Sequence, residues 1–468
     1  MEFNPFVKKY RKGMRRVALV YPNRYVGGIA NTGLQYIYAK INELDAVCER
    51  FYSDVFDGLR SVETATPLSE FDVALFSLQY ETDYFKAVEI SRNFRGLKIA
   101  GGPCVMENPK PLLRYFDAFF IGEVEGHVEE ILNAKDVEDL QGLPGIYTGR
   151  EESVRRVYAK LGKHMQREII GYGAYGRCFL LEIGRGCIRR CRFCIVRQIY
   201  FPPRWRKREM LPEVGEDKVA IIAPSPSDHP EFREILQQYV DEGKEVSPSS
   251  IRADTLDEEL VDLLKLAGVK TLTIAPEAAS PELQEILNKG IDAEDVYHAA
   301  ELARGRFDKI KLYYMIGLPG ENFSDVEAIV EQAVKVKGYV RKVEVSVNPL
   351  VPKPHTPMQW LPFGGKENVK EGINELRKKL SLIAERCRKA GIETDVSGVR
   401  EFILQTILSR GDEDVVEVME GAGYRRFGKY LEAIDVSSEL PWDFIDHGYR
   451  KSSLLREYEK IFNHSTQD

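Results

Sequence analysis

The chain has 468 residues, of which 43% are hydrophobic and 30% charged, an ordinary composition for a folded protein with room for about three domains. Its formal net charge of −7 argues against a surface that binds nucleic acid through general positive charge. The first 16 residues lack an apolar core, and no apolar run approaches the roughly 18 residues of a membrane span, so we expect neither a secretory signal nor a span. Scattered single cysteines disfavour a disulfide framework and favour a reducing cytoplasm; they are Cys48, Cys104, Cys178 and Cys387.

The first third of the chain alternates apolar runs with helical patterns. Continuous runs predict parallel strands buried on both faces, and a periodic segment at 31–44 predicts a helix; the runs lie at 16–22, 72–77, 97–100 and 116–121. Two of the runs lead directly into Gly101-Gly102-Pro103 and Gly122-Glu123. This order predicts a doubly wound, Rossmann-like α/β domain over 1–147, with its site at the carboxyl ends of the strands. The charged stretch 148–170 is predicted to be a linker.

A second alternating series follows the linker. Its apolar runs begin at residues 179, 219, 245, 271, 309 and 342, with helical patterns between them. Six such units are too few for an eight-stranded barrel and predict a partial (β/α)6 barrel over 171–364. Residues 365–468 are rich in helical periodicity and predict a helical C-terminal domain.

Three cysteines, Cys187, Cys191 and Cys194, fall within eight residues, directly after the first strand of this series. Thiolates are the usual protein ligands of iron–sulfur clusters. Three of them would leave one iron of a four-iron cluster open to a small chelating molecule, as a catalytic metal site requires. The alternative is a zinc knuckle completed by Cys178, although zinc sites usually draw their ligands from two dyads.

The spacing of these cysteines, with Phe193 before the last, resembles that of the radical S-adenosylmethionine (radical SAM) superfamily. The resemblance covers residues 179–362, through Ala275-Pro276-Glu277, Gly317-Leu318-Pro319 and the segment 348–357. The N-terminal domain is similar to the cobalamin-binding-type domain of a subgroup of that superfamily. The resemblance implies an enzyme that holds a four-iron four-sulfur cluster and reductively cleaves S-adenosylmethionine to a deoxyadenosyl radical.

The resemblance also implies roles for individual residues. Cys187, Cys191 and Cys194 would ligate the cluster, Phe193 would lie near the adenine, and Glu277 would reach the ribose or the amino group. Further cofactor-binding positions are implied at Ser225, Ser227, Arg252, Gly317 and Pro319 in the barrel, and at Ser77, Gly101, Gly102, Pro103, Gly122 and Glu123 in the N-terminal domain. The family often carries Gly-Gly-Glu after the second barrel strand. Here Ser225, Ser227 or Asp228 must replace it, and the sequence leaves open which one does.

Cobalamin bound in the N-terminal domain would make the enzyme a methyltransferase that acts on an unactivated carbon. The motif Asp-x-His-x-x-Gly, whose histidine ligates cobalt in many such domains, does not occur in this sequence. Two alternatives therefore stay open. One is a cobalamin-free enzyme that modifies RNA or a phosphorylated metabolite, and the other is a non-catalytic iron–sulfur protein. With or without cobalamin, an enzyme of this kind would need an electron donor as a partner, such as ferredoxin or flavodoxin.

The segment 185–208 carries nine lysines and arginines and no acidic residue. Arginine suits phosphate and carboxylate groups, so this segment predicts an anionic substrate that meets residues 204–208. The alternative is that these cations offset the negative charge of the cluster and solvate a surface.

Overall fold

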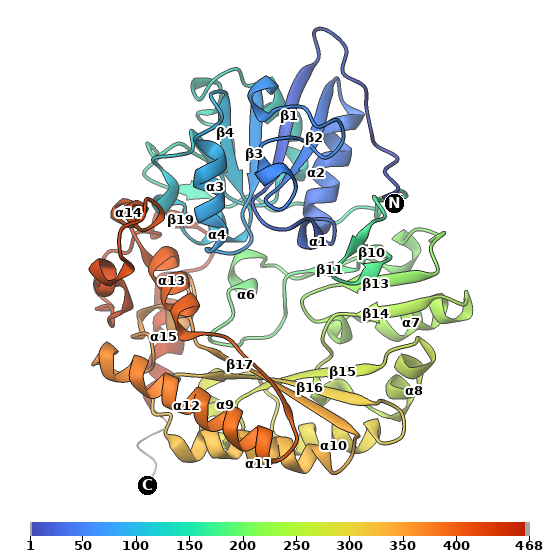
Figure 1. The fold of residues 1–468 in the computed structure, drawn as a ribbon, viewed down its shortest axis with the longest axis vertical. Helices are drawn as coiled ribbons and strands as arrows, with labels where there is room; N and C mark the ends of the chain where they lie inside the picture. The colour runs from blue at the N-terminus through green and yellow to red at the C-terminus, as the bar shows by residue number, and fades with distance from the viewer. Residues whose placement is uncertain (1, 464–468) are drawn as a thin grey trace.

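The N-terminal part of the chain forms a six-stranded sheet in the computed structural model, which describes residues 2–463 (Figure 1). The strand order is β2-β1-β3-β4-β5-β6; five strands are parallel and β6 is antiparallel to β5. The strands are β1 (Arg15–Tyr21), β2 (Ala46–Tyr52), β3 (Val73–Ser77), β4 (Leu97–Gly101), β5 (Ala118–Phe120) and β6 (Ile146–Tyr147). All four predicted strands are present, and the sequence analysis missed β2, an edge strand that is buried along its whole length.

Helices cover both faces of this sheet, as a doubly wound fold requires. Side chains of α2 (Thr32–Glu43) and α5 (Val128–Asn133) share one apolar core with Val17 and Leu19 of β1. Side chains of α3 (Asp83–Ser91) and α4 (Pro103–Glu107) share another core with Ala18 and Val20 of the same strand. Burial on both faces explains why the strands read as unbroken apolar runs. The predicted fold class of this part is confirmed.

The central part of the chain is an arc of parallel strands with helices on its outer side, seen at the right and bottom of Figure 1. One sheet holds β10 (Phe179–Glu182), β13 (Lys218–Ile222) and β14 (Glu245–Pro248). A second sheet holds β15 (Thr271–Glu277), β16 (Lys309–Ile316), β17 (Lys342–Pro349) and β18 (Glu393–Val396). The six predicted strands form the expected partial barrel. The additional strand β18 comes from the segment that was predicted to be helical, and it pairs in parallel with β17.

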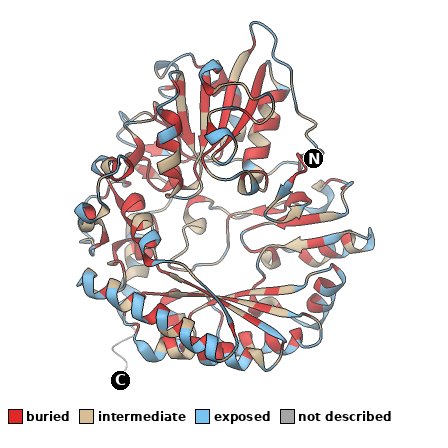
Figure 2. Cartoon of the chain, viewed as in Figure 1, coloured by how far each residue is buried: buried red, intermediate tan, exposed pale blue. Residues whose placement is uncertain are grey.

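The two sides of the barrel strands differ in burial (Figure 2). In β16, Ile310, Leu312 and Tyr314 are buried in the core formed with the outer helices, whereas Lys311 and Tyr313 between them are only partly buried. The outer helices are α7 (Phe232–Asp241), α8 (Glu258–Leu266), α10 (Ala293–Ala303), α11 (Phe323–Lys337) and α12 (Val369–Lys389). Side chains on alternate positions of a strand point to opposite faces, so the inner face of the arc is polar and open.

The C-terminal elements join the two parts. They are α13 (Val399–Arg410), α14 (Val416–Met419), β19 (Ile445–Asp446) and α15 (Lys451–Phe462). Strand β19 pairs with β7 (Val154–Arg155) of the predicted linker, and the Asn108 side chain donates to the backbone oxygens of Ser409 and Gly411. Within residues 2–463 no helix is long and apolar enough to span a membrane.

Candidate functional site

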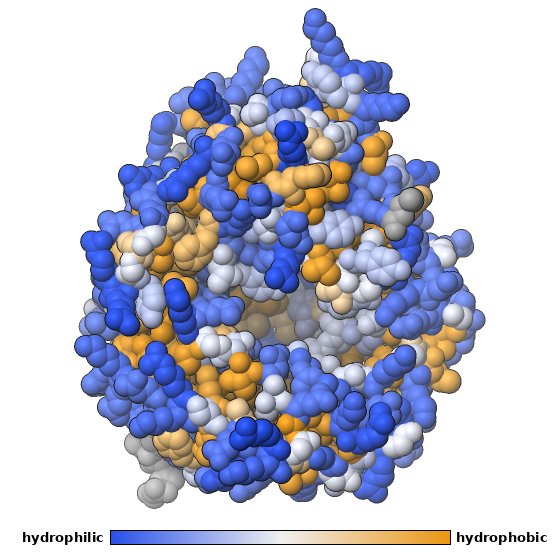
Figure 3. Space-filling view, in the orientation of Figure 1, coloured by the Kyte–Doolittle hydropathy of each residue, from blue (hydrophilic) through white to orange (hydrophobic). Residues whose placement is uncertain are grey.

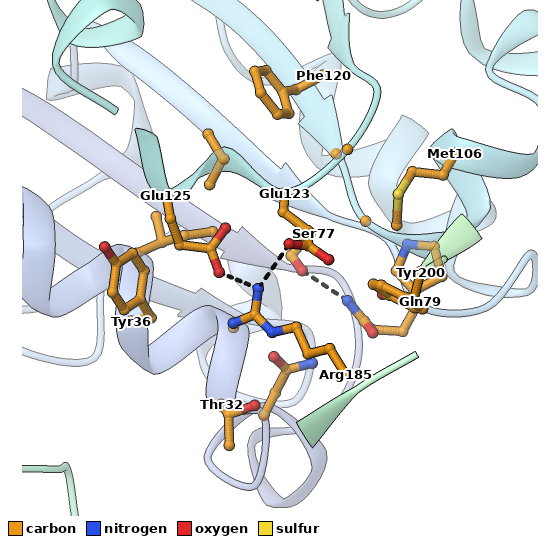
Figure 4. Close-up of a pocket in the computed structure, with 18 of the residues that line it drawn as sticks. Thr32, Tyr36, Ser77, Gln79, Met106, Phe120, Glu123, Glu125, Arg185 and Tyr200 are labelled. Carbon is orange, nitrogen blue, oxygen red and sulfur yellow. Dashed lines mark hydrogen bonds and ion pairs between the residues drawn. The ribbon is translucent and has the colours of Figure 1, made fainter. Parts of the chain in front are cut away.

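A cavity of about 480 Å³ lies at the carboxyl edge of the N-terminal sheet, where that edge faces the barrel (Figure 4). The sheet side of the cavity is formed by residues that follow β3, β4 and β5. The opposite wall comes from Arg185, Gly186 and Tyr200, which flank the three cysteines in the sequence. All six positions that were expected to bind a cofactor in the N-terminal domain line this cavity: Ser77, Gly101, Gly102, Pro103, Gly122 and Glu123.

The turn after β4 shapes one wall of the cavity. Gly102 has φ +107°, and a Cβ atom there would lie 2.5 Å from the Leu78 carbonyl oxygen, so the chain itself requires glycine. Gly101 is different, because a Cβ atom there would meet protein atoms only at 3.7 Å, an ordinary contact distance. Pro103 then begins the short helix α4. The backbone conformation and the close Leu78 carbonyl oxygen therefore explain why residue 102 is glycine. They do not explain why residue 101 is glycine.

A buried network of ion pairs joins the cavity to the barrel. Glu123 accepts two hydrogen bonds from Arg204, at 2.6 and 2.7 Å, and one from the backbone N–H of Ala159, at 2.7 Å. Arg185 contacts Glu123 and Glu125 on the N-terminal side (Figure 4). It also donates to Glu182 at the end of β10 at 2.6 Å. The Glu123 carboxylate is thus held by the protein, and its clearest role is to fix the cavity wall against the barrel.

The same network changes the interpretation of the basic segment. Arg204 binds Glu123, and Arg206 is buried and donates to Glu182 at 2.7 Å. Burial alone would raise the pKa of Glu182, but Arg185 and Arg206 lower it on balance. Of residues 204–208, which were predicted to meet an anionic substrate, only Lys207 and Arg208 are exposed, so Arg204 and Arg206 do not present free positive charge there. The sequence could not show that acidic partners come from distant strands.

The cysteine loop runs between β11 (Gly184–Arg185) and β12 (Arg204–Trp205), and α6 (Val196–Ile199) follows the last cysteine. Arg192 fixes the loop to the end of α9 (Pro281–Leu287), since its backbone N–H and its guanidinium donate to the oxygens of Leu287, Glu285 and Ile286 at 2.7–3.0 Å. Helix α6 lies at the centre of Figure 1, and the space-filling view in the same orientation is hollowed there (Figure 3).

The three thiols of this loop are free and partly buried. Burial, with a smaller contribution from the neighbouring thiols, raises the pKa of Cys191 to about 12, and burial also raises the pKa of Cys194. Iron binds thiolate, so a cluster would displace these protons on binding. Three thiols grouped on one pinned loop fit the donor set of a four-iron cluster with one open iron.

Cys178 does not complete a zinc site. It is buried in a separate apolar group with Leu180 and Ala220, and its sulfur lies 3.9 Å from the Gly176 carbonyl oxygen. In the described part of the chain, no group of three histidine, cysteine or acidic side chains is arranged around a point that could hold a single metal ion. The zinc-knuckle alternative is therefore not supported.

The barrel residues expected near S-adenosylmethionine surround the cysteine loop. Phe193 packs in one apolar cluster with Ala278, next to Glu277, and with Leu318, next to Gly317 and Pro319. The Glu277 carboxylate is paired with Lys289 at 2.7 Å. The N–H of Gly317 donates to the buried Glu321 carboxylate, and a Cβ atom at Gly317 would point to Leu376 and Gly364 rather than into the barrel. The positive φ of +85°, together with packing against Leu376 of α12, thus accounts for this glycine.

The loop after β13 has free hydrogen-bonding groups. The hydroxyl of Ser227 is buried without a hydrogen-bond partner, and that of Ser225 lies near the Asp228 carboxylate but makes no hydrogen bond of good geometry. Asp228 itself is occupied, because both its oxygens accept from Arg189 of the cysteine loop at 3.1 Å. Unpaired buried hydroxyls are costly, so these serines fit a polar ligand group better than Asp228 does. Arg252 binds Asp254 at 2.8 Å and the oxygens of Lys289 and Gly290.

The sequence analysis missed a buried triad of one lysine and two glutamate side chains between the domains. Lys353, in the loop after β17, contacts Glu81 after β3 and binds Glu107 at the end of α4 at 3.1 Å. Burial, offset in part by Lys353 and increased by Glu81, raises the pKa of Glu107 to about 8. Beside the triad, His355 Nε2 donates to the Glu107 carbonyl oxygen at 2.9 Å. The only signal in the sequence is the Pro352-Lys353-Pro354-His355 run, which does not reveal its partners.

Comparisons with known proteins agree with this arrangement. The model of the "Radical SAM superfamily" matches residues 181–333, and that of "Radical SAM proteins, N-terminal" matches 33–157. The chain is 38% identical to an uncharacterized protein of Methanocaldococcus jannaschii over 428 residues, which is 87% of this chain and 91% of that relative. It is 23% identical to an uncharacterized methyltransferase of Pyrococcus horikoshii, over 65% of this chain and 73% of that relative.

Two solved structures share the fold. The radical S-adenosylmethionine methyltransferase TsrM from Kitasatospora setae, solved with cobalamin and a four-iron four-sulfur cluster, has a TM-score of 0.57 at 17% identity over 74% of this chain and 77% of its own. The cobalamin-dependent S-adenosylmethionine radical enzyme OxsB has a TM-score of 0.51 at 12% identity over 96% and 79%. At these identities the likeness concerns the fold alone.

Proposed function

Because this chain belongs to the radical SAM superfamily, whose enzymes use a four-iron four-sulfur cluster and S-adenosylmethionine, we propose that it is a cobalamin-dependent methyltransferase acting on an unactivated carbon. The observation that carries this proposal is the position of the cavity. It lies at the carboxyl edge of the N-terminal sheet, where doubly wound folds bind ligands, and its far wall is part of the cysteine loop. A cofactor in this cavity would face the cluster across Arg185 and Tyr200.

The residues of the cavity fit a corrinoid in part. The sheet side offers apolar side chains such as Leu75 and Phe120, and the open edge at Gly101 allows a large flat ligand to approach the backbone. A corrinoid is larger than 480 Å³, so part of it would project toward the barrel. No histidine is among the described residues that line the cavity, so cobalt would lack a histidine ligand from the protein. When bound, cobalamin would supply the methyl group.

In the barrel, we propose that Cys187, Cys191 and Cys194 hold the cluster, which when bound would supply one electron to S-adenosylmethionine. Ser225 and Ser227 would donate to or accept from its amino-acid part, and Phe193 would pack against the adenine beside Glu277 and Pro319. Arg192 keeps the loop rigid through its bonds to α9, and the apolar cluster around Phe193 excludes water. The free thiols of all seven cysteines agree with the expected cytoplasmic compartment.

The test is anaerobic purification followed by measurement of cobalt, iron and the products formed from S-adenosylmethionine. The proposal expects one corrinoid and one four-iron cluster per chain, together with methyl transfer. The cobalt(II) form should show no nitrogen splitting from imidazole in its electron paramagnetic resonance spectrum. Deoxyadenosine formation without bound cobalt would favour the cobalamin-free alternative, in which RNA or a phosphorylated metabolite is modified. A bound cluster without any cleavage of S-adenosylmethionine would favour a non-catalytic iron–sulfur protein.

A further inference from the structure

The cysteine loop carries two arginines that no carboxylate within residues 2–463 neutralises. Most other arginines of the basic segment 185–208 are paired: Arg189 with Asp228, Arg192 with Glu457, and Arg185, Arg204 and Arg206 with the carboxylates described above. The exposed Arg208 lies outside the cysteine loop. Arg190 and Arg197 form no ion pair with any residue in the described part of the chain. The asymmetry is local, because both arginines lie within three residues of a proposed cluster ligand.

These two arginines belong to one continuous surface, which we call the loop patch: Ile188, Arg190, Arg197 and Phe201. Arg197 donates to the Ile188 carbonyl oxygen at 3.3 Å, and its guanidinium lies 5.2 Å from the centre of the Phe201 ring. Ile188 is 47% exposed and Phe201 43% exposed, and Arg190 is also exposed. Arg197 also donates to the Arg189 carbonyl oxygen at 3.4 Å, which joins it to the backbone directly before Arg190.

The chemistry of the loop patch suits a protein with acidic groups. Arginine forks bind carboxylates in a fixed geometry, and arginine with exposed aromatic side chains is typical of the centres of protein interfaces. RNA is the other large anion to consider. Its binding depends on many phosphate contacts, and two free cations on a chain of net charge −7 provide few. The patch therefore favours an acidic protein.

We propose that the loop patch is the docking surface for an acidic one-electron carrier protein, of the ferredoxin or flavodoxin type, that reduces the cluster. This inference rests on the proposed function, since a carrier is needed only if the cluster is reduced. The patch is the exposed part of the same loop that holds Cys187 and Cys191, so a carrier bound there has a short path to the cluster. One electron leaves the reduced carrier, which is oxidised by one unit, and enters the cluster; no bond forms or breaks.

The experiment compares the wild type with R190Q, R197Q and the double variant in the cluster-loaded protein. The matched control is R95Q, which removes an exposed arginine from the turn before β4. Binding of an oxidised acidic ferredoxin, and in a second series of an acidic flavodoxin, is measured by calorimetry at low and at physiological salt. Cluster reduction is followed by stopped flow, with each reduced carrier and with reduced methyl viologen, a small cation.

The double variant should weaken carrier binding and slow reduction by the carrier about tenfold or more at low salt, with a smaller effect at physiological salt. Reduction by methyl viologen should stay at the wild-type rate, and R95Q should behave as wild type. Unchanged carrier binding in the double variant overturns the inference, as does equal slowing with methyl viologen, which would mean that the arginines tune the cluster. If the double variant loses binding to mixed transfer RNA while its carrier binding is unchanged, the inference is overturned and the patch binds RNA instead. If the wild type binds and accepts electrons from the carrier but never cleaves S-adenosylmethionine, the proposed function fails while the docking surface stands.

Discussion

Gly101 and Gly102 are neighbours in the sequence, but the structure gives them different reasons to be glycine. At Gly102 the positive φ and the Leu78 carbonyl oxygen exclude a side chain. At Gly101, which lines the cavity, a Cβ atom would meet protein atoms only at an ordinary contact distance of 3.7 Å. Gly102 is therefore required by the backbone conformation, and we expect Gly101 to be required by the ligand in the cavity.

Replacing Gly101 with alanine should leave the thermal unfolding midpoint nearly unchanged and weaken corrinoid binding, because the added methyl group narrows the cavity. Gly102→Ala should instead lower the free energy of unfolding by more than about 1 kcal/mol, because alanine is strained at positive φ. Thermal melting and an absorbance titration with hydroxocobalamin measure the two effects. Equal corrinoid affinity in Gly101→Ala and wild type would show that the cavity has another occupant.

The cysteines allow a similar comparison. Replacing Cys187, Cys191 and Cys194 with alanine should abolish iron binding and the absorbance of the cluster after anaerobic reconstitution, because the thiolates are its proposed ligands. Cys178→Ala is the matched control, since Cys178 lies in a separate apolar group, and it should retain full iron content. Full iron binding in the triple variant, or stoichiometric zinc in the wild type, would contradict the assignment.

At the scale of elements, helix α12 fixes the loop that follows β16. Lys379 of α12 donates to the Glu321 carboxylate at 2.8 Å, and this carboxylate accepts from the N–H of Gly317 at 3.0–3.1 Å. Both side chains are buried. The helix therefore acts on a loop proposed to lie near S-adenosylmethionine without contributing a residue to that loop.

Glu321→Ala should lower the free energy of unfolding by about 3–5 kcal/mol, because it leaves a buried lysine and backbone N–H groups without their partner. Glu321→Gln keeps an acceptor for the backbone and should cost less. The first transition in urea unfolding reports both values, and calorimetry on the folded variants reports affinity for S-adenosylmethionine. If Glu321→Ala is as stable as Glu321→Gln, the loop after β16 keeps its conformation without the pair of Glu321 and Lys379.

At the scale of the whole molecule, the domains meet at the triad of Lys353, Glu81 and Glu107. Glu81 and Glu107 follow β3 and β4, the strands whose ends shape the cavity, and Lys353 follows the barrel strand β17. His447 of the C-terminal segment adds a bond to the Met106 carbonyl oxygen at 2.9 Å. Contacts from three distant parts of the chain thus hold the cavity wall over the barrel.

The triad predicts a pH dependence. The pKa of Glu107 in the folded chain, about 8, lies above its ordinary value of 4.5, so the folded protein keeps a proton that the unfolded chain releases. Stability from this group should therefore fall as the pH rises from about 4.5 to about 8. Glu107→Gln, which mimics the protonated carboxyl group, should flatten that slope. Unfolding midpoints measured from pH 5 to pH 8 test this, and parallel curves for the variant and the wild type would contradict it.

Local sequence patterns determined the fold class and the identity of the cysteine loop. Buried parallel strands must be apolar along their length, so most strands of the sheet and of the barrel could be predicted from continuous runs of apolar residues in the sequence. The spacing of Cys187, Cys191 and Cys194 is a local property as well, because one loop carries all three. The strand β18 escaped prediction because it is short and exposed, with the charged sequence Glu393–Val396.

Pairing between distant segments was decided only by the tertiary structure. The sequence shows that 185–208 is basic, but not that Glu123 and Glu182 neutralise Arg204 and Arg206, nor that Arg190 and Arg197 have no acidic partner within residues 2–463. It likewise contains Lys353 and Glu107 without indicating that they meet. The positions of charged residues and motifs can be read from the sequence. The partner of a buried charge depends instead on which strands the fold brings together. The sequence by itself therefore determined the family and the position of the cysteine loop, and the tertiary structure decided which charged side chains have an acidic partner.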